Sequence, residues 1–390
     1  MPSFLKNLTS VFEKKQSATG SLIALQSAGQ PVWTPHDYGA LAREGFMQNA
    51  IVYRCVRMIA ESAASVPLHV REGREVLDEH PLLSLLQRPN SAQSGSDLLE
   101  DWYGYLMVAG NAYLEAVSND REVLELHVLR PDRMKLVPGE DGWPEFYEYS
   151  VAGRQMRFHQ AIEGQKPILH MSLFNPLNDH YGMSPLEAAA FSLDIHNAAG
   201  GWNKALLDNA ARPSGALVYG AKDASLSVEQ FDRLKAELES SHQGAMNAGR
   251  PMLLEGGLDW KPMGYSPRDM DFIEAKWVAA REIALALGVP PMLLGIPGDN
   301  TYSNYQEANR TFWRQTVLPL VNRTSGALCN WLDESYGTAL SLKPDLNNIE
   351  ALSGERDARW QRIAKADFLT VNEKREALGY GPLEEGEQIG

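Results

Sequence analysis

The chain has 390 residues, enough for two or three domains of ordinary size. Apolar residues make up 44% of it, so it can bury a sizeable core, and this composition excludes a wholly disordered or collagen-like chain. The formal net charge is −14, from 36 basic and 50 acidic side chains. This excess of acid argues against a protein that holds nucleic acid by broad phosphate neutralisation, although such a chain can still touch DNA without holding it.

Cysteine usage and hydropathy predict a soluble protein made in a reducing cytoplasm. Cys55 and Cys329 are two isolated thiols, which build neither a disulfide framework nor a zinc site, so we expect both to be free. The most apolar stretch, Trp277–Leu294, is broken by charges and two prolines and is too polar for a membrane span. Residues 1–35 predict a flexible arm whose apolar face and three lysines suit docking better than a membrane surface.

Residues 36–183 predict an α+β region. Helices are expected over Asn49–Ser65, between Pro81 and Pro89, and over Asp97–Val108, with a strand over Val66–Arg71. From 113 to 171, short apolar runs alternate with turn clusters, which is typical of strands. The predicted strands are Tyr113–Val117, Glu125–Leu129, Met134–Val137, Phe146–Val151 and Ile168–Met171.

Two long helices are predicted next. Ser184, Pro185 and Glu187 supply a cap, a first-turn proline and a capping-box glutamate, and they start a helix over 185–211 that is about 40 Å long. Ser266-Pro267 repeats this start, and a second helix of about 30 Å ends at Gly288. Along it, the side chains at helical spacing that we expect to pack are Ile273, Trp277, Ala280, Ala284 and Leu287.

Residues 213–265 predict a small α+β insert between these helices. A strand is expected over Gly215–Tyr219, a helix after Ser227, and a hairpin around Gly256-Gly257 that joins Met252–Leu254 to Leu258–Lys261. Two long helices that bracket a compact insert describe a shaft with a knob at its end.

A polar loop follows the second helix, from Gly295 to Asn304. Tyr302 and Tyr305, in or beside it, either stack on nucleic-acid bases or cover neighbouring helices. We expect a long helix over 305–331, kinked at Pro319, and then a helical tail of mixed charge over 353–378.

Known catalytic motifs are not found. Gly215, Gly220 and Lys222 suggest part of a phosphate-binding loop, but Ala221 separates glycine from lysine and Asp223 replaces the magnesium-binding Ser or Thr. No HExxH or GxSxG occurs and the histidines form no i, i+4 pair, so we expect no cofactor, no metal and no enzymatic activity. The alternative is a metal-dependent nucleic-acid hydrolase built from scattered carboxylates.

Several short motifs follow one another in a specific order from about residue 40 to 340. The most specific block runs from Ile283-Ala284 through Gly288-Val289-Pro290-Pro291-Met292-Leu293-Leu294-Gly295 to Thr301-Tyr302-Ser303-Asn304. The others are Tyr53-Arg54-Cys55-Val56, Val66-Pro67-Leu68, His80-Pro81-Leu82, Arg88-Pro89-Asn90, Gly110-Asn111-Ala112-Tyr113 and Asn209-Ala210-Ala211-Arg212-Pro213-Ser214-Gly215. In this order they resemble the HK97-like portal proteins of tailed bacteriophages and gene transfer agents.

The resemblance implies a portal architecture, α+β and mostly helical. Its implied parts are a flexible N-terminal arm (1–35), a wing (36–183, β-rich over 113–171), a first stem helix (184–212), a clip (213–265), a second stem helix (266–288), a tunnel loop (289–304), a long kinked helix of the wing (305–345) and a crown or C-terminal tail (346–390).

The resemblance also implies a function without catalysis. Portal proteins form a ring, typically of twelve copies, at one capsid vertex of the virion, and double-stranded DNA is packaged and ejected through it. The implied partners are further copies of the chain, the major capsid protein, the terminase large subunit and a head-tail adaptor protein, with assembly in the bacterial host cytoplasm and no membrane. The loop side chains expected to face passing DNA are Asp299, Asn300, Thr301, Tyr302, Ser303 and Asn304.

Overall fold

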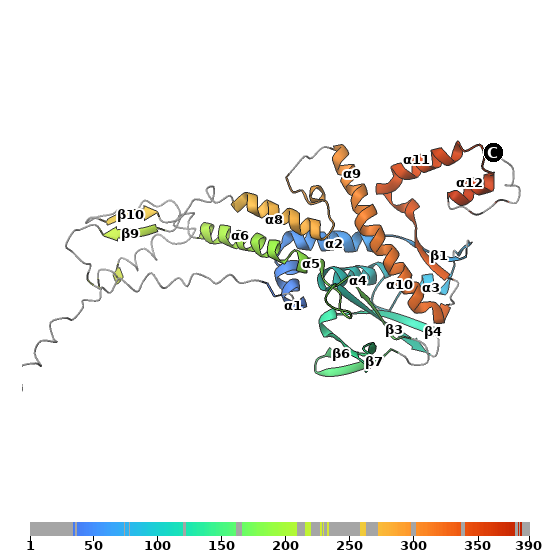
Figure 1. Ribbon diagram of the computed structural model, residues 1–390, viewed down its shortest axis with the longest axis horizontal. Coiled ribbons are helices and arrows are strands. Elements are labelled where there is room, and N and C mark those ends of the chain that lie inside the picture. Colours follow the sequence, from blue (N-terminus) through green and yellow to red (C-terminus); the bar gives the residue numbers. More distant parts are fainter. Residues whose placement is uncertain are drawn as a thin grey trace, which may run out of the picture. The chain divides into compact units, whose positions relative to one another are not determined.

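The computed structural model describes residues 34–35, 37–73, 75–77, 79–119, 122–160, 166–208, 215–219, 227, 229, 232–233, 258–262, 272–297, 302–336, 340–378, 381 and 383. In this part of the chain the fold is α+β and mostly helical, with small antiparallel sheets (Figure 1). The helices and strands all belong to the unit formed by residues 35–390. Predictions that lie outside the described residues are the N-terminal arm, most of the insert with its Gly256-Gly257 turn, the Ser266-Pro267 helix start, Asp299, Asn300, Thr301 and the acidic C-terminus.

Asn49 starts helix α2 (Ala50–Ala64). Its side-chain oxygen accepts the N–H groups of Ile51 and Val52, at 3.0 and 3.2 Å, which have no partner inside the helix. Apolar residues three and four positions apart then place one face in the core: Val52, Cys55, Val56, Ile59, Ala60 and Ala63. The predicted helix over Asn49–Ser65 is confirmed.

Helix α4 (Gly95–Ala109) is fixed at both ends by local chemistry. Ser94 and Asp97 form a reciprocal capping box at its start. Gly110 ends it with φ +69°, and a Cβ there would lie 2.5 Å from the carbonyl carbon of Met183. Only glycine combines this left-handed backbone with so close a neighbour.

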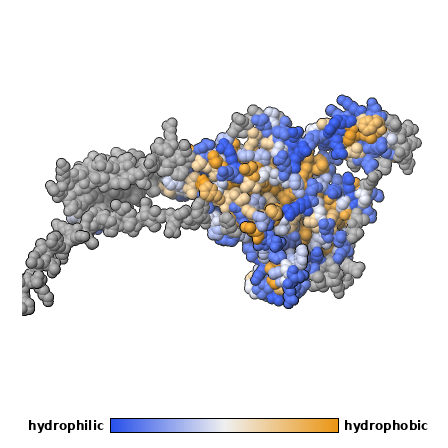
Figure 2. Space-filling model, viewed as in Figure 1, coloured by the Kyte–Doolittle hydropathy of each residue, from blue (hydrophilic) through white to orange (hydrophobic). Residues whose placement is uncertain are grey.

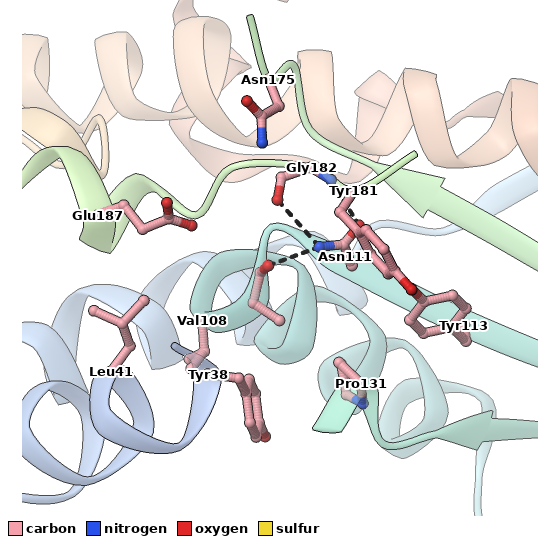
Figure 3. A pocket seen from close by; sticks show the side chains of 11 residues that line it. Tyr38, Leu41, Val108, Asn111, Tyr113, Pro131, Asn175, Tyr181, Gly182 and Glu187 are labelled. Carbon is pink, nitrogen blue, oxygen red and sulfur yellow. Dashed lines mark hydrogen bonds between the residues drawn. The ribbon is translucent and has the colours of Figure 1, made fainter. Parts of the chain in front are cut away.

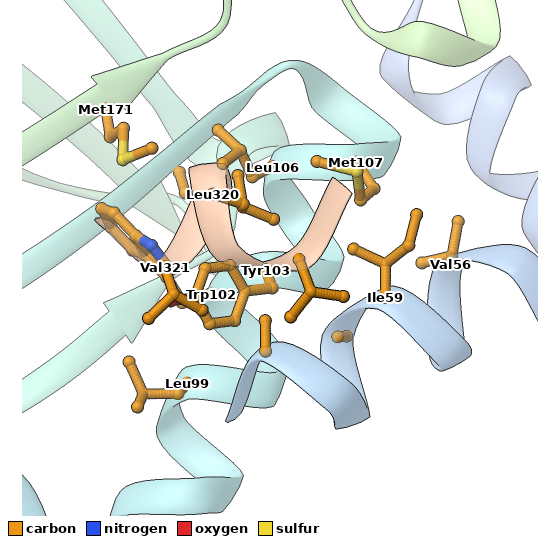
Figure 4. Packing of buried hydrophobic residues seen from close by; sticks show 14 of the residues in the cluster. Val56, Ile59, Leu99, Trp102, Tyr103, Leu106, Met107, Met171, Leu320 and Val321 are labelled. Carbon is orange, nitrogen blue, oxygen red and sulfur yellow. The ribbon is translucent and has the colours of Figure 1, made fainter. Parts of the chain in front are cut away.

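The main core joins α2 and α4 to α10 (Leu318–Tyr336), which comes from much later in the chain (Figure 4). Trp102 of α4 is fully buried, and its indole nitrogen donates a hydrogen bond to Thr324 Oγ1 of α10 at 3.4 Å. Burying an apolar side chain of this size stabilises the fold by about 2–3 kcal/mol. The core therefore fixes the later helix against the two earlier ones.

Strand β3 (Asn111–Asn119) contributes to two separate cores. It lies between β4 (Glu122–Leu129) and β8 (Ile168–Ser172), antiparallel to both. Because successive side chains point to opposite faces of a sheet, Ala112 and Leu114 pack into the main core, while Tyr113 packs into a second cluster. The second cluster also draws on the sheet of β5 (Met134–Pro138), β6 (Pro144–Val151) and β7 (Arg154–His159).

The five strands predicted between 113 and 171 are present, but the prediction missed β2, β7 and β11. Strand β7 is almost entirely exposed, and its only apolar residues are Met156 and Phe158, so its apolar alternation is too short to predict a strand. Strand β11 (Leu340–Pro344) pairs with β1 (Leu68–Glu72), which also pairs with β2 (Glu75–Leu77). Its pairing partner is distant in sequence, and no local signal marks it.

Shorter helical elements connect the longer helices and strands. They are α1 (Tyr38–Ala40), the π-helix η2 (Leu41–Met47), α3 (Pro81–Gln87), and the 3-10 turns η3 (Pro131–Arg133), η5 (Pro291–Leu294), η7 (Leu346–Asn348) and η8 (Glu350–Leu352). The predicted short helix after His80 is α3, and the histidine side chain caps it.

The predicted helix over 185–211 is two helices, α5 (Pro185–Ala188) and α6 (Ala190–Asp208). The capping box of Ser184 and Glu187 starts α5 as expected. Ala189 leaves helical geometry although alanine is the best helix former, so packing and not propensity interrupts the helix.

Helix α6 packs against α8 (Phe272–Ala286), where Ser192 donates a hydrogen bond to Glu282. In the insert, β9 (Gly215–Tyr219) is found as predicted, and it pairs with β10 (Leu258–Pro262).

The helix after the polar loop begins earlier than predicted. It consists of α9 (Tyr302–Phe312), the π-helical turn η6 (Trp313–Val317) and α10. The prediction placed Tyr302, Ser303 and Asn304 in the loop because they are polar, but polar side chains are common in a first turn, where backbone N–H groups lack partners. The irregular turn precedes Pro319, which has no N–H to continue the α-helical pattern.

The C-terminal tail is helical, as predicted, but it is interrupted. Its helices are α11 (Ser353–Ala364) and α12 (Val371–Ala377), and a capping box of Thr370 and Glu373 starts the second. Neither contains a buried residue, and Phe368 between them is 80% exposed. Trp360 of α11 is also 40% exposed.

Asn49 also joins the start of α2 to α6. Its amide nitrogen donates to Asn197 Oδ1 at 2.8 Å and to His196 Nδ1 at 3.0 Å, while Asn197 donates to the backbone oxygen of Glu44 at 2.9 Å. With its oxygen capping α2, every hydrogen-bonding position of this buried amide is used. One side chain thus fixes the angle between two helices that are distant in sequence.

Replacing Asn49 with alanine is expected to lower the free energy of unfolding by about 2 kcal/mol or more, because it removes a cap and leaves His196 and Asn197 without their donor. Thr370→Ala, which removes only the cap of the exposed helix α12, is the matched control and should cost about 1 kcal/mol or less. Urea unfolding followed by circular dichroism measures both. Equal losses would show that Asn49 acts as a cap alone.

Candidate functional site

The candidate site is the polar loop that connects α8 to α9, and its first anchor is Gly288. This residue ends α8 in the left-handed conformation, with φ +69°. Its carbonyl oxygen accepts a hydrogen bond from Thr316 Oγ1 of the π-helical turn η6 at 2.6 Å. A Cβ added to Gly288 would lie 2.8 Å from Thr316 Oγ1. The end of α8 is therefore held directly against the irregular turn of the next long helix.

The second anchor lies just before the central loop residues. Arg281 of α8 donates from Nη2 to the backbone oxygen of Pro297 at 2.8 Å. The neighbouring Ile296 is 2% exposed and Val289 is 1% exposed, so both apolar side chains fix this segment to the body. The loop thus leaves from a rigid base, as loops that carry function commonly do.

The structure describes only some of the predicted DNA-facing residues. Asp299, Asn300 and Thr301 lie outside the described residues. Ser303 and Asn304 are exposed in the first turn of α9, and Tyr302 begins that helix. Tyr305, one turn further on, is 48% exposed, so about half of its surface does not pack against other residues of the chain.

The residues predicted to pack along α8 divide into two groups. Ala280, Ala284 and Leu287 are buried, at 0%, 0% and 3% exposure, and Trp277 is partly buried. Ile273 is 65% exposed, so it does not pack in the core of the single chain. The buried residues of α8 all lie in its C-terminal half, which contacts α2 and α5.

Charged side chains connect α9 to the C-terminal segment. Arg310 pairs with Glu307 within α9, and its Nε lies 3.6 Å from Glu355 Oε1 of α11. Arg314 of η6 reaches the same carboxylate oxygen at 3.2 Å. These groups are exposed, so each pair contributes little to the free energy of unfolding. Their effect is to orient α11 relative to the helix that follows the loop.

A buried polar network holds strands β3, β6 and β8 to the segment that leads into α5. Asn111 donates to the backbone oxygens of Ala109 and Gly182, at 2.9 and 3.1 Å, and accepts the N–H of Gly182 at 2.8 Å. Its oxygen also lies 3.0 Å from His170 Nε2, and Tyr147 lies 3.3 Å from His170 Nδ1.

These contacts define the protonation of His170. Because the amide group of Asn111 donates twice through nitrogen, its oxygen must be the acceptor, and the Nε2 of His170 must carry the hydrogen. Nδ1 then accepts from Tyr147, which requires a neutral ring. Burial, with a smaller effect of His180, lowers the pKa of His170 to about 4.

Sequence reasoning missed Thr316 and Arg281, which anchor the loop, and also the buried polar groups Asn111, His170 and Asn49, which join distant segments. Asn111 belongs to one of the motifs that carry the resemblance to a known family. Nothing local indicated, however, that its hydrogen-bond partners lie 59 and 71 positions away in the sequence. The other four carry no motif.

The described residues show no group of three or more His, Cys, Asp or Glu side chains that could hold a metal ion. In the described part of the chain no helix is long and apolar enough to cross a membrane. Both cysteines are free, and burial raises the pKa of Cys55 to about 12, so it is no nucleophile at neutral pH.

The family model for phage portal proteins matches residues 50–379. The chain belongs to the phage portal protein family. It is 55% identical to a chain in the neck of an empty GTA particle, a structure computed with C6 symmetry; the match covers 94% of this chain and 100% of that one, with a TM-score of 0.72.

Two further relatives extend the comparison. A chain in the neck of a native gene transfer agent particle, computed with C12 symmetry, is 54% identical over 94% of this chain and 100% of that one, with a TM-score of 0.70. The portal protein of Enterobacteria phage HK97 is 26% identical over 358 residues, 88% of this chain and 81% of the relative. Portal proteins are structural proteins and not enzymes, and the hydrolase alternative finds no support in these similarities.

The neutral His170 predicts how stability changes with pH. The unfolded chain protonates this histidine near pH 6.5 and the folded chain only near 4, so stability is retained above about 6.5 and falls as the pH drops through this window. Between about pH 7.5 and 5 the expected loss is about 2 kcal/mol. His170→Gln, which cannot titrate, should show a correspondingly smaller loss in urea unfolding at both pH values. The same loss in both proteins would contradict the assignment.

Proposed function

We propose that the chain forms a ring of twelve copies at one capsid vertex and that double-stranded DNA is packaged and ejected through this ring. The observation that carries the proposal is the similarity of nearly the whole chain to one that forms a neck computed with C12 symmetry. A closed ring built from one repeated contact needs two different complementary patches on each copy. On the face in view, apolar patches alternate with hydrophilic ones and offer such contacts (Figure 2).

In this proposal the elements take the portal roles that their order suggests. Helix α6 and helix α8 belong to the stem (184–212 and 266–288), and β9 and β10 to the clip (213–265). The main core and its sheets form the wing (36–183 and 305–345), and α11 and α12 the crown. Residues 289–304 form the tunnel loop, and 1–35 an arm.

The acidic charge suits a conduit. Every contact that binds a DNA phosphate also resists movement of the DNA. A channel that passes long duplexes must therefore avoid tight binding of phosphates by cationic side chains. Twelve copies at −14 carry roughly −170 in all, a field that opposes static adhesion of DNA. Polar side chains then meet the duplex by contact and shape, without reading its bases.

We assign this contact to the tunnel loop. Asp299, Asn300 and Thr301 supply polar and acidic groups, and Ser303 and Asn304 continue them on the first turn of α9. Tyr302 adds a ring at the point where the loop becomes a helix. The anchors at Gly288 and Pro297 support this role, because a loop on a rigid base can meet a moving duplex without unfolding its surroundings.

The proposed partners follow from the place of such a ring in a particle. They are the major capsid protein around the vertex, the terminase large subunit during packaging, and a head-tail adaptor protein afterwards, with assembly in the host cytoplasm and final location in the virion.

Electron microscopy of whole particles tests the ring. The expected result is one ring of this chain at a single vertex, with an axial channel wide enough for duplex DNA. Whole particles are the right material because isolated portal rings can close with other copy numbers. Finding the chain as a monomer in the particle, or a ring without an axial hole, would refute the proposal.

Asp299→Lys tests the loop. In twelve copies it places a ring of cations in the channel, and we expect packaged DNA per particle to fall about tenfold, because each lysine can hold a phosphate. Asp299→Asn removes the charge without adding a cation and should have a small effect. Asp367→Lys, exposed in the C-terminal segment, is the control for added charge alone. Packaging measured by nuclease-protected DNA that stays at the wild-type level in Asp299→Lys would remove the loop from the DNA path.

A further inference from the structure

A cavity of about 290 Å³ lies where the start of the described unit, the end of α4 and the segment before α5 meet (Figure 3). Most small-molecule sites measure about 300–1,000 Å³, so this cavity is better matched to one side chain than to a cofactor. It combines one carboxylate with three tyrosines, those of Tyr38, Tyr113 and Tyr181.

The carboxylate of Glu187 supplies the charge of the cavity. One of its oxygens accepts the backbone N–H of Ser184 at 2.9 Å, which fixes the side chain in the capping box of α5. Figure 3 shows the side chain pointing from α5 into the cavity. A carboxylate held in one orientation at the wall of a cavity is a counter-ion for an incoming cation.

The environment of the Tyr113 side chain also indicates a ligand. It is 1% exposed and lines the cavity, yet its hydroxyl group makes no hydrogen bond to any residue that the structure describes. One face of its ring stacks on His170 at a centroid distance of 4.3 Å. The hydroxyl group therefore opens to the cavity, where an occupant can accept or donate a hydrogen bond.

Other polar groups of the cavity narrow the kind of occupant. Asn111 is already used fully within the protein. Asn175 accepts the N–H of Leu177 at 3.0 Å through its oxygen, and its amide nitrogen points into the cavity in Figure 3. That nitrogen can donate to a carbonyl, which a peptide carries and a bare metal ion does not.

The segment that supplies Asn175 to the cavity wall favours a polypeptide as the occupant. Phe174 and Leu177, on either side of Asn175, are 82% and 95% exposed, among the most exposed large apolar side chains of the described chain. Exposed apolar side chains near a polar cavity are typical of protein contact sites. The net charge of −14 further favours a partner with basic groups.

We propose that this cavity binds the cationic side chain, arginine or lysine, of a segment from another polypeptide. Glu187 pairs with the cation, the tyrosine rings offer it their electron-rich faces, Asn175 donates to the backbone of the segment, and Phe174 and Leu177 cover its apolar neighbours. The site lies apart from the tunnel loop, and its test does not depend on DNA passage.

The probe is N-acetyl-L-arginine amide, which carries the guanidinium group and two amide carbonyls. Titrated into the full-length protein and followed by saturation-transfer NMR, it should bind saturably in the millimolar range. N-acetyl-L-citrulline amide has the same shape without the charge and should bind at least about tenfold more weakly. Binding of the two with equal affinity would overturn the proposal, as would no saturable binding of the arginine compound.

Glu187→Gln identifies the site, because glutamine keeps the capping box but removes the charge. It should weaken the arginine probe about tenfold and leave the citrulline probe unchanged. Glu75→Gln, the same change at an exposed position of β2, is the matched control and should have no effect. Tyr113→Phe removes only the unpartnered hydroxyl and should weaken binding by a smaller factor. Unchanged arginine binding in Glu187→Gln would refute the assignment even if the probe binds elsewhere.

Discussion

The packing of α10 against α2 and α4 is the constraint on which the rest of the structure depends. It buries Trp102 completely and joins segments that are more than two hundred residues apart through the Trp102–Thr324 hydrogen bond. The C-terminal half of α8 enters the same core through Ile283 and Ala284. Both helices that flank the loop between α8 and α9 are therefore fixed to one body, α8 by its C-terminal half and α9 through Phe312 and the continuous helix that follows it.

Fully satisfied amide side chains position the elements that this core joins. Asn49 caps one helix while binding another, and Asn111 joins two strands to the segment before α5. Each uses both donors and the acceptor oxygen, so a shift of either element would leave a buried polar group unpaired. Such groups specify orientation, whereas the apolar core mainly supplies stability.

A portal ring must be rigid and yet must not bind what passes through it. In the described part of the chain, buried apolar and amide side chains supply the rigidity, and the chain as a whole carries a net negative charge that opposes adhesion of DNA. The segments that connect them, such as the π-helical turn η6 with its hydrogen bond to Gly288, are short and anchored. The ion pairs of Arg310 and Arg314 with Glu355 likewise anchor the C-terminal segment to the helix that follows the loop, although such exposed pairs add little stability.

The sequence by itself determined the beginnings and ends of elements, because caps and breakers act through neighbouring backbone groups. Asn49, Ser184, Gly110 and Gly288 mark boundaries that the structure has, and the order of motifs determined the family. Only the tertiary structure decided which segments meet. The pairing of β11 with β1, the break at Ala189, the exposure of Ile273 and the partners of Asn111 depend on contacts between distant residues. Local patterns cannot encode these contacts, since the same strand or amide would suit many partners until the core selects one.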